Sequence, residues 1–261
     1  MTRSITYSLI DPTGNITLLV ETPVPVEVQP AVARQLMALE PATEQVGFVT
    51  CAEDGVSLRM AAGEFCGNAT MSAAALYMQN SRKTEAVVCV RVCGTGCVQV
   101  HMTAVPGDVW KGTVTMPQPL SVGRECMPDG RKLPVVRFPG LAHVILEKEI
   151  EPSEAEFLAA DWCQKMDTAA LGLMFLNRET SSLKPLVYVP AAGTLFWETS
   201  CASGTTAVGA FLAAEADKSI SLSLSQPGGT LEIFADPIGP LLLSGKVRIL
   251  HRTTDITVTM T

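Results

Sequence analysis

Alternation of apolar and polar positions is the dominant pattern along the chain, and it predicts strands. Several of these runs are bounded by Gly- or Pro-containing turns, such as the segment 11–15 after the first run. In the first part of the chain we expect strands at 5–10, 16–21, 46–50, 56–62, 86–92, 97–102 and 112–117. In the second part we expect them at 133–138, 142–149, 171–177, 185–190, 229–235, 240–250 and 255–261.

Four segments predict helices, at about 28–39, 68–78, 152–165 and 202–216. The second and the fourth are small or apolar on nearly every side, which is typical of a buried helix. Each of these two follows a cysteine, and Cys66 and Cys201 are 135 residues apart. The strands that begin near Asn15 and His143 are 128 residues apart, so one supersecondary unit occurs twice.

This duplication predicts an α+β fold of two pseudo-symmetric halves, each a mostly antiparallel sheet or barrel around a buried central helix. We expect residues 1–119 to form the half with Cys66 and residues 120–250 the half with Cys201, with 117–123 as the connector. The last strand, 251–261, is a candidate to return to the first half.

Composition narrows the classes of function. Apolar residues make up 47% of the 261 residues and the net charge is −7, which supplies a large core but no cationic face for nucleic acid. Because no run approaches the roughly 18 apolar residues of a membrane span, and no signal peptide is apparent, we expect a cytoplasmic protein without membrane contact.

Three of the eight cysteines, Cys89, Cys93 and Cys97, follow one another at four-residue intervals. Disulfides are disfavoured in a reducing cytoplasm. Two alternating runs joined by Gly94-Thr95-Gly96 predict a hairpin, in which Cys89 and Cys93 would be small buried residues of one face. A zinc site is the alternative, although only His101 lies near as a further ligand.

Cys66 and Cys201 suggest a different chemistry. A thiol at a helix start lies beside unpaired N–H groups and the positive end of the helix dipole, so we expect a lowered pKa and a competent base. The same N–H groups can bind a carboxylate. Two such thiols on opposite faces of one α-carbon would remove and return a proton, which is the reaction of a racemase.

The residues around both cysteines also resemble a known family. The segments FCGNAT and SCASGTTA, with DPTGNITLLV and PGLAHVIL, are similar to the motifs of the diaminopimelate epimerase superfamily of cofactor-independent amino-acid racemases. This resemblance spans nearly the whole chain. The segments MAAGEFCGNAT and WETSCASGTTA are most similar to the histidine racemase branch, known from the biosynthesis of opine-type metallophores.

The resemblance implies a role for each site residue. Cys66 and Cys201 would be the catalytic acid/base pair, and Asn15 would bind the polar groups near the reacting carbon. Glu198 would hold the substrate ammonium, with Glu64 as a weaker rival. The backbone N–H groups that would bind the substrate carboxylate belong to Gly67, Asn68, Ala202 and Ser203. The resemblance implies no cofactor and no metal, and a homodimer stays open.

Departures from the family pattern narrow the substrate. Leu141 and Gly172 replace asparagines that would hold the distal head of diaminopimelate, and no arginine precedes Cys201. We therefore expect racemisation of L-histidine, with Phe65, Phe196 and Trp197 either as walls for the imidazole or as core residues. A diaminopimelate epimerase, an isomerase of another small carboxylic acid and a binding module without turnover are the alternatives.

Overall fold

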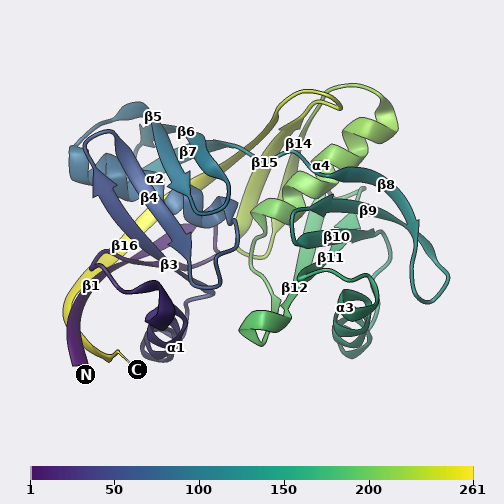
Figure 1. The fold of residues 1–261 in the computed structure, drawn as a ribbon. Coiled ribbons are helices and arrows are strands. Elements are labelled where there is room, and N and C mark those ends of the chain that lie inside the picture. The colour runs from purple at the N-terminus through teal and green to yellow at the C-terminus, as the bar shows by residue number, and fades with distance from the viewer. Residues whose placement is uncertain (1, 261) are drawn as a thin grey trace. The chain divides into compact units, whose positions relative to one another are not determined.

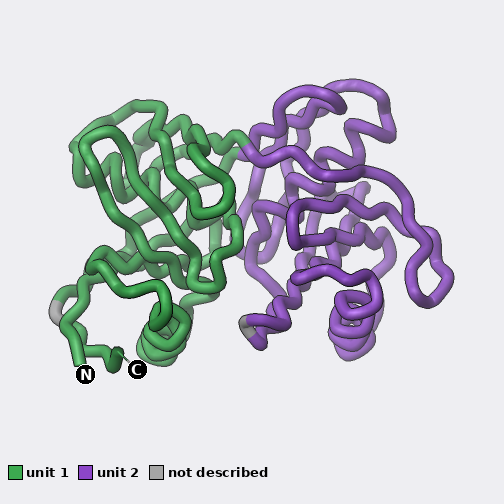
Figure 2. Tube along the Cα trace, in the orientation of Figure 1, with its two compact units in different colours: residues 1–115, 244–261 green, residues 116–243 purple. Residues whose placement is uncertain are grey.

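Two buried helices, one in each part of the sequence, organise the structure. The computed structural model describes residues 2–260, apart from the side chains of Ala192 and Asp255. The chain divides into unit 1, residues 1–115 with 244–261, and unit 2, residues 116–243 (Figure 2). Helix α2 (Gly67–Ser81) belongs to unit 1, and α4 (Ala202–Ala216) belongs to unit 2.

Unit 1 is a closed barrel of mixed strands. Strand β1 pairs with β2 on one side and with β16 on the other, while β16 also pairs with β7 (Figure 1). The pairs β2–β3 and β4–β5 are parallel, and the other pairs given are antiparallel. Its elements are β1 (Thr2–Pro12), β2 (Thr17–Val20), η1 (Val26–Val28), α1 (Gln29–Leu39), β3 (Gln45–Ala52), β4 (Gly55–Met60), α2, β5 (Glu85–Val92), β6 (Gly96–Val105), β7 (Val109–Thr115) and the larger part of β16 (Leu241–Thr259).

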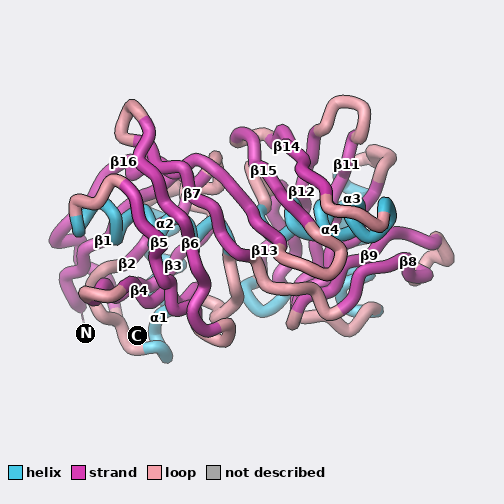
Figure 3. Tube along the Cα trace, turned by 90° about the horizontal axis from the view of Figure 1, so that it is seen from above, coloured by secondary structure: helices cyan, strands magenta, loops and turns pink. Residues whose placement is uncertain are grey.

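Unit 2 repeats the alternation of antiparallel and parallel strand pairs in a sheet of order β15-β14-β12-β11-β10-β9-β8. Helix α4 contacts the strands at both ends of this order, and α3 packs on β11 and β12 (Figure 3). The elements are β8 (Ser121–Cys126), β9 (Lys132–Phe138), β10 (Leu141–Leu146), α3 (Pro152–Lys165), β11 (Ala170–Asn177), β12 (Ser182–Val189), η2 (Pro190–Ala192), β13 (Thr194–Trp197), α4, β14 (Ile220–Gln226) and β15 (Gly229–Ala235).

Small side chains are what allow the two central helices to be enclosed. Helix α2 contacts all of the strands β1–β7, and residues 67–78 of it are buried. In α4, a Cβ atom at Gly209 would lie 2.6 Å from the side chain of Ile233 on β15. Strands can therefore pack directly against the helix backbone, and the predicted α+β fold with buried central helices is confirmed.

Three parts of the strand prediction are wrong. The expected connector 117–123 contains the start of β8, and strands β13 and β14 were not expected. Strand β8 is mostly exposed, so no hydrophobic period marks it. The two expected strands 240–250 and 255–261 are one strand, β16, because the polar residues between them pair with β1 through His251, Arg252 and Thr253. Within residues 2–260, no helix is long and apolar enough to cross a membrane.

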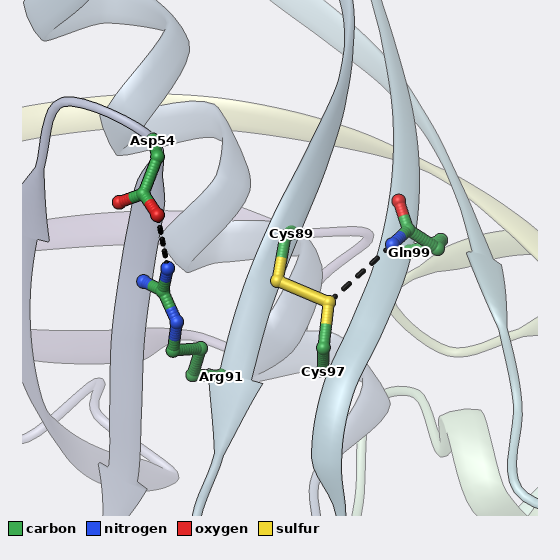
Figure 4. The surroundings of a disulfide bond; sticks show 5 residues. All are labelled: Asp54, Cys89, Arg91, Cys97 and Gln99. Atoms are coloured by element: carbon green, nitrogen blue, oxygen red, sulfur yellow. Dashed lines mark hydrogen bonds and ion pairs between the residues drawn. A yellow bond between two sulfur atoms is a disulfide. The ribbon is translucent and has the colours of Figure 1, made fainter.

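The hairpin of β5 and β6 is confirmed, but the expected state of its cysteines is wrong. Cys89 forms a disulfide with Cys97, and their Cα atoms are 5.6 Å apart (Figure 4). The register pairs Cys89 with Gln99, which makes Cys97 its diagonal neighbour on the outward face of the hairpin. Cys93 lies beyond the end of β5 and is exposed. The buried face is instead the one that carries Val88 and Val90.

Removing this disulfide should destabilise the protein. Closing a loop of this length by a disulfide stabilises by about 2–3 kcal/mol in the chain-entropy model. We expect Cys89→Ser to lower the free energy of unfolding by about that amount in urea titrations without reductant. In a reductant the variant and the parent protein should become alike. Equal urea midpoints of the two proteins without reductant would contradict the prediction.

Candidate active site

Cys66 caps the N-terminus of α2. Its backbone is extended, with φ −135° and ψ 117°, and its sulfur accepts a hydrogen bond from Ala69 N at 3.4 Å. Its carbonyl oxygen accepts from Thr70 Oγ1 at 2.7 Å. These bonds fix the thiol at the first turn of a buried helix, whose first N–H groups have no carbonyl one turn earlier.

A chain of amide and carboxylate groups leads away from Cys66. The thiol donates to Gln45 Oε1 at 3.0 Å, and Gln45 Nε2 donates to Asn15 Oδ1 and, at 2.7 Å, to Thr17 Oγ1. Asn15 is 3% exposed, and its Nδ2 donates to Glu44 Oε2 at 2.8 Å. The pairing of β2 with β3, which sets Thr17 opposite Gln45, therefore holds Gln45 against the thiol and Asn15 against Gln45.

Cys201 caps α4 in the same way. Its φ is −127° and its ψ 109°, its sulfur accepts from Gly204 N at 3.4 Å, and its carbonyl oxygen accepts from Thr205 Oγ1 at 2.7 Å. Gln226, the last residue of β14, accepts a bond from Cys201 N at 2.9 Å and donates to Thr205 Oγ1 at 2.8 Å. The duplication thus includes the cap itself.

The polar groups around Cys201 differ from those around Cys66. Burial, the negative charge of Glu198 and a hydrogen bond to its carboxylate raise the pKa of Cys201 well above the usual range. Ser203, whose Oγ lies 3.5 Å from the sulfur, acts in the opposite direction on this pKa. The expectation that the helix start lowers the pKa of this thiol is therefore wrong, because burial and Glu198 outweigh it. Cys201 is a thiol at neutral pH.

His143 on β10 completes this group. Its Nε2 lies 3.0 Å from Ser203 Oγ, and the side chain is fully buried. Burial lowers the pKa of His143 to about 3, so the ring is neutral. Nδ1 has no hydrogen-bond partner among the described residues, which suits the unprotonated nitrogen, since buried orphan acceptors cost less than orphan donors. Nε2–H then donates to Ser203, and the hydroxyl of Ser203 can donate to Cys201.

Gly172 serves this histidine rather than the substrate. It pairs with His143 across the parallel strands β10 and β11, and a Cβ atom at Gly172 would lie 2.2 Å from His143 Nδ1. Any side chain at position 172 would therefore displace the imidazole. The absence of asparagine at this position follows from the space that His143 occupies.

The remaining predicted site residues lie where their helices begin or in the preceding segments. Gly67, Asn68 and Ala202 are buried in the first turns of α2 and α4. Glu198 is half-buried and acts on Cys201, whereas its rival Glu64 is exposed. Thus Asn15, Cys66, Gly67 and Asn68 come together in unit 1, and Glu198, Cys201, Ala202 and Ser203 come together in unit 2.

Sequence reasoning assigned no role to Gln45, His143 or Gln226. A signal existed only for His143, through the Gly-x-x-His pattern of residues 140–143. The two glutamines stand at strand ends with no local motif, and only the folded strands bring them to the cysteines. Among the side chains that the structure describes, no group of three from His, Cys, Asp or Glu could hold a metal ion.

Residues 4–252 match the family model described as the histidine racemase CntK N-terminal domain. The chain is 31% identical over 242 residues to the histidine racemase of Staphylococcus aureus, which covers 87% of both chains. It is also 31% identical over 253 residues to the histidine racemase of Fusobacterium nucleatum subsp. nucleatum, covering 92% of both. The chain belongs to the histidine racemase family. The predicted resemblance and the predicted isomerase class, an amino-acid racemase, are confirmed.

Solved structures with this fold include more distant proteins. A predicted epimerase from Pseudomonas aeruginosa superposes with a TM-score of 0.72 at 15% identity, covering 96% of this chain and 98% of its own. A hydroxyproline epimerase from Agrobacterium vitis superposes with a TM-score of 0.68 at 14% identity, covering 97% and 92%. At such identities the likeness concerns the fold alone, and it agrees with the α+β fold of two pseudo-symmetric halves that the duplicated sequence predicts.

Two substitutions beside Cys201 should move its titration in opposite directions. Glu198→Gln removes the negative charge that raises the pKa of Cys201, so the titration midpoint of this thiol should fall. Ser203→Ala removes a hydrogen bond that lowers the same pKa, so the titration midpoint should rise. The ultraviolet absorbance of thiolate is followed against pH for each variant. Subtracting the curve of the same variant with Cys201→Ser leaves the titration of Cys201 alone. Shifts of the same sign would contradict this account.

A side chain at position 172 should destabilise unit 2. We expect Gly172→Ala to cost about 1–3 kcal/mol, the usual range for overpacking, because its Cβ atom would overlap the ring of His143. Gly123→Ala on β8 is the matched control, since its Cβ atom would meet nothing within 4 Å. Urea unfolding of both variants measures the difference, and equal stabilities would be the contrary result.

Proposed function

We propose that this chain is a cofactor-independent racemase that inverts the α-carbon of L-histidine with Cys66 and Cys201 as its two bases. One observation carries the proposal: each unit presents a thiol as the cap of a buried helix, with similar extended dihedral angles and the same threonine bond. Relatives named histidine racemases at 31% identity support the choice of reaction and substrate.

Cys66, whose thiol donates to Gln45 Oε1, must first lose this proton to solvent. In the forward direction, the resulting Cys66 thiolate takes the α-proton of the L-amino acid, and the C–H bonding electrons stay on the α-carbon and its carboxylate. The Cys201 thiol then donates its proton to the opposite face, which leaves a Cys66 thiol and a Cys201 thiolate. The reverse reaction exchanges the two roles. The raised pKa of Cys201 supports its role as the resting acid. The proposal requires both sulfur atoms to reach one α-carbon.

Two features would stabilise the charges of this reaction. The N–H groups of Gly67, Asn68, Ala202 and Ser203 would bind the substrate carboxylate as negative charge builds up on it, because helix N-termini favour anions. Glu198 would hold the substrate ammonium. A bound ammonium would offset the charge that keeps Cys201 protonated, and it would thereby help this thiol to serve as a base in the reverse direction.

The nature of the substrate side chain is inferred from the polar and charged protein groups that a second charged head would need. A second charged head would need partners, since an unpaired charge in a dry site is costly. Leu141 is apolar, and position 172 admits no side chain beside His143. An imidazole, with an unperturbed pKa of about 6.5, can enter neutral. We further infer a cytoplasmic enzyme that acts on the free amino acid, although the Cys89–Cys97 disulfide is unusual for that compartment.

Substitution of either thiol tests the mechanism. Cys66→Ala and Cys201→Ala should each lower the rate of racemisation by about 10²–10⁴-fold, the usual contribution of a positioned acid or base. Circular dichroism of L-histidine over time measures the rate, and Cys126→Ala on exposed β8 is the control. Near-parental racemisation by either active-site variant would refute the two-base mechanism.

A choice of substrates tests the specificity. Purified enzyme in D2O should exchange the α-proton of L-histidine and invert this carbon, with LL-diaminopimelate turned over poorly. Proton NMR of the α-position measures both reactions side by side. A preference for diaminopimelate would show that the enzyme holds a distal head after all, and exchange without inversion would indicate a one-base reaction.

A further inference from the structure

Strand β13 leads directly to Cys201 and presents two aromatic residues, Phe196 and Trp197, to opposite faces of the sheet. The register with β12 pairs Val187 with Phe196 and Leu186 with Trp197. Directly opposed residues of antiparallel strands lie on the same face, and neighbouring residues of a strand lie on opposite faces. The environments of Val187 and Leu186 therefore identify the two faces.

Trp197 lies on the face that α3 covers. Leu186 belongs to the apolar cluster formed with α3. The Trp197 ring stacks on Phe175 of that cluster at 5.6 Å between centroids, and its Nε1 donates to Glu156 on α3 at 3.0 Å. Trp197 is thus held away from the catalytic thiol of unit 2, and it is not a wall for the substrate.

Phe196 lies on the other face, which carries Cys201. Val187 packs against the apolar cluster that contains Cys201 and the helix α4. Glu198 N donates to Pro185 O at 3.0 Å, which continues the pairing of β13 with β12 by one step. Glu198 is two residues after Phe196, so its side chain leaves on the same face, where it hydrogen-bonds Cys201. Phe196 is nevertheless 41% exposed.

We propose that Phe196 forms the aromatic wall against which the imidazole of the substrate stacks, and that it thereby sets the preference for histidine. This inference rests on the proposed function. A large apolar ring, left partly exposed on the same face of β13 as Glu198 and two residues before it, is positioned to cover the side chain of an amino acid whose ammonium Glu198 would hold. Offset stacking of two flat rings favours an aromatic side chain over an aliphatic one.

The test compares variants that keep or remove the ring. Phe196→Leu should raise KM for L-histidine and lower kcat/KM about 10-fold, a typical effect of one apolar contact in a specificity pocket, while kcat changes little. Phe196→Tyr should stay close to the parent enzyme. Phe157→Leu is the matched control, since Phe157 is 68% exposed on α3, which covers the opposite face.

The outcomes separate this inference from the function on which it rests. A parent enzyme that does not racemise L-histidine would overturn both. A parent enzyme that does so, with an unchanged KM in Phe196→Leu, would overturn the aromatic wall alone. An equal loss of kcat/KM for L-histidine and for an unbranched aliphatic amino acid would also contradict it, because a wall that selects the imidazole should affect histidine more.

Discussion

A buried helix start is the constraint on which both parts of the candidate site depend. A helix that begins inside a protein leaves N–H groups that must find acceptors away from water. In each unit a cysteine sulfur satisfies one of them, and a threonine one turn later fixes the carbonyl of the same cysteine. The remaining groups of the first turn point where an anion could bind. The cap, the thiol and the proposed anion site are therefore one local structure.

The pKa of Cys201 shows which effect dominates when a buried thiol lies at the start of a helix. The field of a helix N-terminus is worth about 0.3–1 kcal/mol at exposed positions and about 2 kcal/mol in favourable buried ones. Removing a thiolate from water costs several kcal/mol, and the carboxylate of Glu198 adds repulsion. Burial therefore determines the sign, and the helix dipole and Ser203 only reduce the size of the effect. A position at the start of a helix does not by itself lower the pKa of a buried cysteine enough to form a thiolate.

The sequence predicted what local patterns encode. Both central helices, the hairpin of β5 and β6 and both cysteine caps follow from the period of apolar positions and from repeated motifs. Strand β8 could not be found because neither face is consistently buried. The disulfide was not predicted because the thiols of a cytoplasmic protein were expected to stay reduced, and because the parity of Cys89 alone does not say which face of the hairpin points inward. Gln45 and Gln226 reach the cysteines only through strand pairing between distant segments, which no short motif records.

The two units differ in the groups that surround an otherwise repeated cap, and this difference suits the proposed reaction. The repeat of 135 residues relates Cys66 to Cys201, Thr70 to Thr205 and the left-handed residue Arg82 at the end of α2 to Asp217 at the end of α4. The thiol of Cys66 donates to a neutral amide, whereas that of Cys201 faces a carboxylate. A racemase with two bases needs one sulfur with a proton and one without it at the start of each turnover. Two identical sites would have no preference for which thiol holds the proton. Here burial and Glu198 keep the proton on Cys201, and a substrate ammonium at Glu198 would weaken their effect when the proposed reaction must run backwards.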